Sequence, residues 1–253
     1  MQITTVPAAT GAAWLRDGWR LLRAQPLGLP AMVVVYLFML LVPAQLPYVG
    51  IAIAGVLSPF ATLGMLACCR EVWRRRAPTP AQFAQPFRDA QRRAPLLRLG
   101  IINAVLWIAI ASVALVIGPD PATGGPPTSM QDIPLDALIA QLLLYSPVLV
   151  VMLFAPPLAG WHALPPGKAM FGSAIACWRN KGALSVYGAL TMAVLVGVSL
   201  IAVALIGVLG VSQTVAQLVL APLGLALLAL IQATMYPMYR SIFEVQADAG
   251  VEG

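Results

Sequence analysis

The residues best placed to do chemistry are arginines, which gather in one stretch of the chain. Eight of the fifteen basic residues lie between residues 70 and 98: Arg70, Arg74, Arg75, Arg76, Arg88, Arg92, Arg93 and Arg98. A basic residue near an anionic membrane surface contributes on the order of 1 kcal/mol to binding. Six of them are therefore candidate contacts for anionic lipid: Arg74, Arg75, Arg76, Arg88, Arg92 and Arg93. The alternative is that these charges only set the orientation of the protein in a membrane.

Catalytic and metal chemistry have little support in the sequence. Catalysis at a membrane needs ionisable groups near one another, but the chain has one histidine, His162, and no acid inside any predicted span. The acids expected beside the basic residues are widely separated: Asp17, Glu71 and Asp89. The cysteines lack metal-ligand spacing: they are Cys68, Cys69 and Cys177. We therefore predict no catalytic, cofactor or metal site, and no enzymatic activity.

A few neutral polar residues fall inside the apolar runs. The candidate intramembrane polar residues are Asn103, Gln217 and Gln232. Such side chains commonly form hydrogen bonds between helices, which are worth about 0.6 kcal/mol each. The alternative is that they line a water-filled cavity for a neutral solute. Ion-coupled transport is disfavoured, because it usually needs a charged residue within the membrane.

The elements that position these residues are membrane spans. The chain is 60% hydrophobic and only 9% charged, whereas soluble domains carry roughly 25% charged residues. Charge-free runs cover residues 24–69, 99–119, 137–161 and 182–239, which are 46, 21, 25 and 58 residues long. Because a helix crosses the hydrocarbon core in about 20 residues, these runs predict two, one, one and two spans. The six predicted spans are 27–45, 48–69, 96–118, 135–161, 183–209 and 212–236.

The basic residues also predict an orientation. All fifteen precede the first span, lie between spans 2 and 3 or between spans 4 and 5, or directly follow the last span. Lys and Arg concentrate on the cytoplasmic side of membrane proteins. We therefore expect a multi-pass protein of the bacterial inner membrane with both termini in the cytoplasm. The net charge of +6 then belongs to the cytoplasmic face, and no folded basic module points to a nucleic-acid partner.

Each pair of spans is preceded by a segment with the pattern of an amphipathic helix. The first begins with Thr10 as a cap and carries Trp14 and Trp19, which are suited to the headgroup layer, with Leu15, Trp19 and Leu22 on its apolar face. The second begins at Thr79-Pro80 with Phe83 and Phe87 as apolar contacts, and Pro95 is expected to end it. The third covers residues 168–181, with an apolar stripe of Met170, Phe171, Ala174, Ile175 and Trp178.

These segments indicate an internal repeat. Thr10, Trp14, Arg23 and Pro26 match Thr79, Phe83, Arg92 and Pro95 at a constant offset of 69 residues. We predict an all-α membrane protein of six transmembrane helices arranged as three hairpins, each preceded by a cytoplasmic amphipathic interfacial helix. The whole chain, residues 1–253, is then a single integral membrane domain with repeat-like units at about 10–69, 79–161 and 167–240.

A stripe of small residues in span 5 suggests a helix contact. Its members recur every four residues: Ser185, Ala189, Ala193 and Gly197. Small side chains allow two helices to approach closely in a membrane. We expect another helix of the same chain to pack there, with a homodimer as the alternative.

The first 26 residues carry a resemblance. Val6-Pro7-Ala8, Gly11, Trp14, the run from Asp17 to Leu22, and Pro26 resemble uncharacterised proteobacterial inner-membrane proteins. The chain is also distantly similar to the membrane domain attached to some bacterial glycerophosphodiester phosphodiesterases. The resemblance covers the whole chain in layout but only these residues in motif. It implies no activity, because the catalytic domain of the phosphodiesterases has no counterpart here.

The function that these observations favour is a non-enzymatic membrane module that binds lipid, anionic lipid in particular, or a partner protein. The alternative is a transporter or channel for a neutral or amphipathic solute. A cavity lined by Asn103, Gln217 and Gln232 would favour the alternative, and a dry bundle with an exposed basic face would favour the module.

Overall fold

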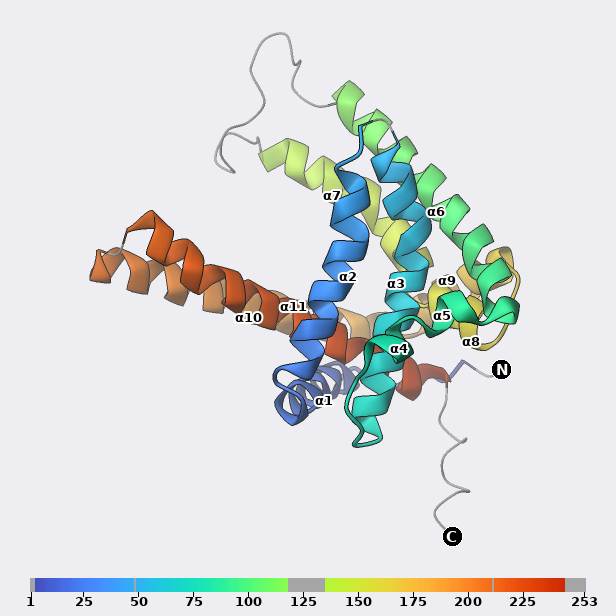
Figure 1. The fold of residues 1–253 in the computed structure, drawn as a ribbon, viewed down its shortest axis with the longest axis horizontal. Coiled ribbons are helices and arrows are strands. Elements are labelled where there is room, and N and C mark those ends of the chain that lie inside the picture. The colour runs from blue at the N-terminus through green and yellow to red at the C-terminus, as the bar shows by residue number, and fades with distance from the viewer. Residues whose placement is uncertain (1–2, 48, 118–134, 211, 244–253) are drawn as a thin grey trace. The chain divides into compact units, whose positions relative to one another are not determined.

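The chain is helical throughout the part that the computed structural model describes, residues 3–47, 49–117, 135–210 and 212–243 (Figure 1). In chain order the helices are α1 (Thr10–Ala24), α2 (Gly28–Ala44), α3 (Gly50–Trp73), α4 (Pro80–Phe83), α5 (Gln85–Arg88), α6 (Ala90–Ile117), α7 (Leu135–Met152), α8 (Ala155–Trp161), α9 (Pro166–Arg179), α10 (Lys181–Leu209) and α11 (Gln213–Phe243). The prediction of an all-α chain is confirmed for these residues. The predicted outer loop 119–134 and the acidic tail from residue 244 lie outside them.

Several helices are long and apolar enough to cross a membrane. Five qualify alone: Gly50–Trp73, Ala90–Val113, Leu143–Trp161, Lys181–Leu209 and Thr214–Phe243. A sixth arises if α1 and α2, which meet at a bend of 102°, count as one span. The 17 residues of α2 extend roughly 26 Å at about 1.5 Å per residue, close to the ~30 Å hydrocarbon core. Five to six crossing helices therefore agree with the predicted number, whereas their pairing as three hairpins stays a prediction.

Prolines end some helices and lie inside others. Pro26 lies in the joint between α1 and α2, and the helix of residues 135–161 is interrupted where α7 stops and α8 begins. The prediction that Pro95 ends a helix is wrong, because α6 runs through it. The missing N–H of Pro95 would have bonded to the carbonyl group of Gln91. Gln91 is exposed in the first turn of α6, so water can satisfy that carbonyl group.

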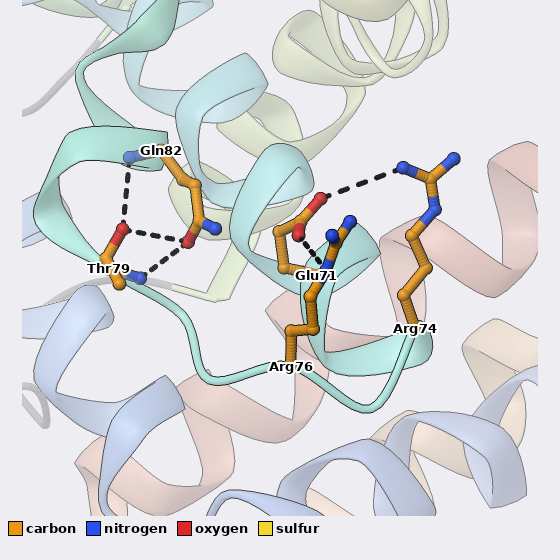
Figure 2. Close-up of polar contacts among 5 residues, drawn as sticks. All are labelled: Glu71, Arg74, Arg76, Thr79 and Gln82. Carbon is orange, nitrogen blue, oxygen red and sulfur yellow. Dashed lines mark hydrogen bonds and ion pairs between the residues drawn. The ribbon is translucent and has the colours of Figure 1, made fainter.

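The two threonines predicted to cap helices behave differently. Thr79 forms a capping box with Gln82: its backbone N–H donates to Gln82 Oε1 at 2.7 Å, and its Oγ1 accepts from the backbone N–H of Gln82 at 3.4 Å (Figure 2). The capping prediction for Thr10 is wrong, because α1 starts at Thr10 itself and its N-cap makes no side-chain hydrogen bond. The carbonyl groups of Pro7 and Ala8 accept from the N–H groups of Thr10 and Gly11, so no side-chain cap is needed there.

The described chain divides into two compact units, which we treat separately. Unit 1 comprises residues 1–38, 62–86 and 175–253, and unit 2 comprises residues 39–61 and 87–174. The boundaries fall inside α2, α3, α5 and α9, so both units contain parts of the same helices. This division does not follow the predicted repeat-like units, and the prediction of one integral membrane domain stays a prediction.

Unit 1 is built around the packing of α1 on α10 and α11. Gly11 lies against the backbone of Ala183 and Gly18 against that of Thr234, so closely that a Cβ atom at either glycine would overlap the neighbouring helix. Trp14 is 1% exposed and its indole Nε1 donates to Ser241 Oγ at 2.8 Å. The expectation that Trp14 lies in the headgroup layer is therefore wrong.

The apolar stripes predicted for α1 and α9 are only partly buried: Leu22 of α1 is buried, but other members lie at the surface. Trp19 of α1 is exposed, and Phe171 and Trp178 of α9 are largely exposed. The buried residues of α9 are small instead: Ala169, Ser173, Ala176 and Cys177. Helix α9 thus buries small residues and leaves large apolar side chains on the surface, whereas α1 also buries Trp14, Leu21 and Leu22. The interfacial location of both helices stays a prediction.

The small-residue stripe of α10 does not contact another helix of the chain in the described structure. Ser185, Ala189 and Ala193 are exposed. A Cβ atom added to Gly197 would meet no atom within 4 Å among the described residues. The expected contact with a helix of the same chain is therefore wrong for the described residues, and the homodimer stays a prediction.

A short extended segment before α1 is fixed by one asparagine of unit 1. Asn180, between α9 and α10, is 1% exposed. Its Oδ1 accepts from the backbone N–H of Val6 at 2.8 Å, and its Nδ2 donates to the carbonyl group of Thr4 at 3.1 Å. The N–H of Thr4 in turn donates to the carbonyl group of Ile242 at 2.9 Å. The start of the chain is thus attached to the beginning of α10 and the end of α11.

Unit 2 contains a helix break at which a side chain from a neighbouring helix bonds the free backbone groups. The helix is interrupted between α7 and α8, where two prolines occupy the first turn of α8. Ser173 of α9 is fully buried there: its Oγ donates to the carbonyl group of Val150 at 2.7 Å and accepts from the N–H of Phe154 at 3.1 Å. Backbone groups freed by a helix break in a membrane need such partners, so α9 stabilises the break.

Candidate functional site

The basic stretch begins with a tight turn at the end of α3. The backbone N–H of Arg76 donates to the carbonyl group of Glu71, and the N–H of Arg75 donates to that of Val72, both at 2.9 Å. These two bonds define a Schellman motif, which closes a helix when the residue after the cap is left-handed. Arg75 has φ +60° and occupies that position, where glycine is usual. The turn places three consecutive arginines around the last turn of an apolar helix.

Glu71 is the centre of this turn. Its carboxylate accepts from Arg76 Nε at 2.7 Å and lies 3.8 Å from Arg74 Nη1, one arginine on each oxygen (Figure 2). Glu71 is 8% exposed, while both arginines are exposed. A buried carboxylate is costly unless it is paired, so this carboxylate holds the two guanidinium groups in defined positions.

The second group of candidate arginines lies in unit 2, around α5 and the start of α6. Arg92 Nε donates to Asp89 Oδ2 at 2.8 Å, which neutralises one of the charges. Arg88 and Arg93 are exposed, and among the described residues neither has an ion-pair partner. Of the six predicted lipid contacts, Arg75, Arg88 and Arg93 therefore present exposed guanidinium groups that are not paired with an acid within the described chain.

Three acids whose side chains the structure describes each pair with an arginine three residues later. Asp17 pairs with Arg20 at 3.0 Å on α1, which is the same three-residue spacing found for Glu71 with Arg74 and for Asp89 with Arg92. Within the described ranges, no group of three or more His, Cys, Asp or Glu residues could hold a metal ion.

Aromatic residues of unit 1 connect the end of α3 to the end of α11. The guanidinium group of Arg240 lies 5.1 Å from the ring centroid of Trp73, and Tyr236 meets the same ring edge-on at 6.0 Å. A cation over an indole face is attracted by the ring quadrupole. Trp73, which directly precedes Arg74, therefore packs against α11. Arg240 of α11 adds a further cation beside the turn of Arg74 to Arg76.

The intramembrane polar candidates have different surroundings. In unit 2, Asn103 is buried, and its Nδ2 donates to the carbonyl group of Gly55 at 2.9 Å. In unit 1, the side chain of Gln232 hydrogen-bonds with Tyr36, whereas Gln217 is exposed. Gln217 and Gln232 are 15 residues apart on α11, roughly 22 Å at about 1.5 Å per residue. Asn103 and Gln232 thus bond within the protein, and the assignment of these three residues to a solute pathway stays a prediction.

Sequence reasoning did not assign Glu71, Ser173 and Asn180 their roles. The role of Glu71 could have been predicted from its spacing. Arginines follow it three and five residues later, and its carboxylate can pair with both where the helix ends. Ser173 and Asn180 had none, because their partners are backbone groups of distant segments.

Comparison with known proteins gives one informative similarity. The chain is 33% identical, over an alignment of 259 positions, to a protein of Burkholderia thailandensis described as a probable inner membrane protein. The alignment covers 97% of this chain and 95% of that protein. No family model matches the chain. No solved structure matches it either. The likeness to the membrane domain of the phosphodiesterases receives no support and stays a prediction.

Proposed function

We propose that this chain, which belongs to the family of bacterial inner-membrane proteins that includes the Burkholderia thailandensis relative, is a non-enzymatic module that binds anionic phospholipid through its basic stretch. Membership of the family and the apolar helices support an integral protein of the bacterial inner membrane. The lipid-binding role is the further step.

The proposal includes an orientation. Six spans would form three hairpins, with α1, the α4–α5 segment and α9 on the cytoplasmic surface and both termini in the cytoplasm. The distribution of Lys and Arg supports this arrangement. The inner leaflet carries a negative surface potential, so the same orientation places the arginines beside anionic headgroups.

The observation that carries the proposal is the set of exposed arginines without an acidic partner in the described chain: Arg75, Arg88 and Arg93. Orienting the protein in the membrane would require only positive charge on one side. The chain neutralises Arg92 with Asp89 but leaves these three arginines without an acid among the described residues, so their charges are available to a lipid headgroup. Each exposed arginine contributes on the order of 1 kcal/mol to binding an anionic surface.

The experiment compares two double variants by native mass spectrometry of the protein extracted in mild detergent, with bound lipids identified. Arg88→Ala/Arg93→Ala removes two unpaired charges, and we expect at least a tenfold loss of bound phosphatidylglycerol relative to phosphatidylcholine. Asp89→Ala/Arg92→Ala removes an ion pair, leaves the net charge unchanged and should keep the preference. Equal lipid retention in both variants would overturn the proposal.

The transporter alternative has less support. Two of its three proposed lining residues, Asn103 and Gln232, form hydrogen bonds inside the protein. A partner protein or a second copy of the chain remains an expectation from the sequence. The same mass spectra report both, through the mass of the intact assembly.

A further inference from the structure

We infer that the turn at the end of α3 is a built site for the phosphate group of a membrane lipid, in which Glu71 is a positioning residue for Arg74 and Arg76. The inference deepens the proposed function and rests on it, because it names the part of the basic stretch that recognises a headgroup. The chemistry recognised is a phosphate, and we assign the source to lipid.

The first argument is the geometry of the Schellman turn. This motif brings the residue two places beyond the cap, here Arg76, over the residue in the last helical turn, here Glu71. An apolar contact usually fills this place, but here the contact is an ion pair of 2.7 Å. The ion pair is made through Arg76 Nε, and Figure 2 shows the guanidinium group beside the carboxylate. A planar group held in this way matches two phosphate oxygens.

The second argument is the contrast in burial. The carboxylate of Glu71 is buried, whereas 47% and 61% of the side chains of Arg74 and Arg76 are exposed. The buried acid pairs closely with Arg76 at 2.7 Å and more loosely with Arg74 at 3.8 Å, which restrains side chains that would otherwise sample many rotamers. Binding a ligand then costs less ordering, because the arginines are already restrained.

The third argument is the conformation of Arg75. The left-handed conformation at φ +60° suits glycine, which carries no Cβ penalty. An arginine at this position adds a third cation to the turn at the expense of backbone strain. The flanking segment is ordered as well, because the capping box of Thr79 begins a new helix three residues after Arg76.

The location favours lipid over free phosphate. The turn follows directly on the 24 residues of α3, which are apolar enough to cross the membrane, so the turn lies at the level of the phosphate layer. Trp73, the last residue of α3, packs against Tyr236 and Arg240. Tryptophan and arginine are typical of this boundary.

The test asks whether removing a negative charge strengthens or weakens the binding of phosphatidylglycerol. Glu71→Gln and Asp17→Asn each remove one acid that pairs with arginine, so each makes the protein more positive by one charge. If phosphatidylglycerol is held by surface charge alone, both variants should bind it up to about fivefold more tightly. If Glu71 positions the arginines, Glu71→Gln should bind it at least fivefold more weakly, and Asp17→Asn should not.

Binding is measured by titrating phosphatidylglycerol or phosphatidylcholine into the purified full-length protein in mild detergent, with and without millimolar inorganic phosphate. A second variant, Arg76→Lys, keeps every charge but loses the planar group, and we expect weaker phosphatidylglycerol binding than in its control Arg16→Lys. The comparison of Arg76→Lys with Arg16→Lys tests the inference even if Glu71→Gln fails to fold.

Three outcomes would overturn the inference. The first is that Glu71→Gln binds phosphatidylglycerol more tightly than the unmodified protein, to the same extent as Asp17→Asn. The second is that Arg76→Lys and its control Arg16→Lys bind phosphatidylglycerol with equal affinity. The third is complete displacement of phosphatidylglycerol by millimolar inorganic phosphate while the unmodified protein still prefers phosphatidylglycerol to phosphatidylcholine in its absence, which would assign the turn to free phosphate. Failure of the proposed function looks different, because the unmodified protein would then show no preference for phosphatidylglycerol over phosphatidylcholine.

Discussion

The two ends of the α10–α11 hairpin are both largely apolar but have different surroundings. At the inner end, where α10 begins and α11 finishes, Ala183, Ala233 and Tyr239 are almost completely buried, and α1 packs across both helices (Figure 1). At the outer end, Leu200 is 64% exposed and Val208 is 85% exposed. Both ends are apolar, so apolar composition alone does not tell a protein contact from a surface that lipid can cover.

The glycines of α1 and α10 also distinguish the two ends of the hairpin. Gly11 and Gly18 of α1 lie against the backbone of the hairpin, and no larger residue fits there without movement. Gly197 and Gly207 of α10 have open space where a Cβ atom would lie. Glycine therefore serves close helix packing at the inner end only, and the predictions below test that difference.

The largest effect is expected for Trp14→Ala at the inner end. Removing a fully buried tryptophan from a packed helix interface should lower the free energy of unfolding by about 3–5 kcal/mol. Trp14→Phe keeps most of the ring but loses the hydrogen bond to Ser241 and should cost only about 1 kcal/mol. Thermal unfolding in detergent measures both, and equal stability of Trp14→Ala and the unmodified protein would show that α1 does not dock there.

A matched pair of glycine substitutions should give the next largest effect. A leucine at Gly18 would overlap Thr234 and push α1 from the hairpin, with a loss of about 3 kcal/mol. A leucine at Gly197 enters open space, and we expect a change below about 0.5 kcal/mol. A similar loss for both variants would contradict the difference between the two ends.

Asn180→Asp tests how the start of the chain is anchored. The change replaces the Nδ2 donor, which serves the carbonyl groups of Thr4 and Ala176, with an oxygen that repels them. We expect a loss of about 2 kcal/mol and faster amide hydrogen exchange at Thr4, whose N–H donates to the carbonyl group of Ile242. Unchanged exchange there would mean that the segment before α1 is held by other contacts.

The smallest effect is expected for Gly197→Ala. Alanine is a better helix former than glycine by about 1 kcal/mol, and nothing lies within 4 Å of the added methyl group among the described residues. The unfolding temperature should therefore stay constant or rise slightly. A clear decrease would indicate that this face packs against something in the membrane, as the homodimer alternative predicts, and the oligomeric state of the variant would then decide.

The spans were predictable because their length has a simple physical cause. The thickness of the bilayer sets the length of a charge-free run, and the predicted span 27–45 agrees with α2 within one residue at each end. The capping box at Thr79 was also predictable, since it depends only on neighbouring residues.

The packing partners were not predictable in the same way. Trp14 and Trp19 are the same residue type five positions apart, and only the docking of α1 on a distant hairpin makes one buried and the other exposed. Likewise Pro26 separates two helices while Pro95 lies inside one. Such differences depend on contacts between remote segments, which periodicity does not contain.

The hydrogen bond between Trp14 and Ser241 joins residues 227 positions apart, which has a consequence for biosynthesis. A ribosome adds about 5–20 residues per second, so roughly 11 to 45 seconds separate the synthesis of these two partners. During that interval α1 has no hairpin on which to dock. The helix made first is thus among the last to reach its final position, and insertion of the nascent chain must be complete before the fold can close.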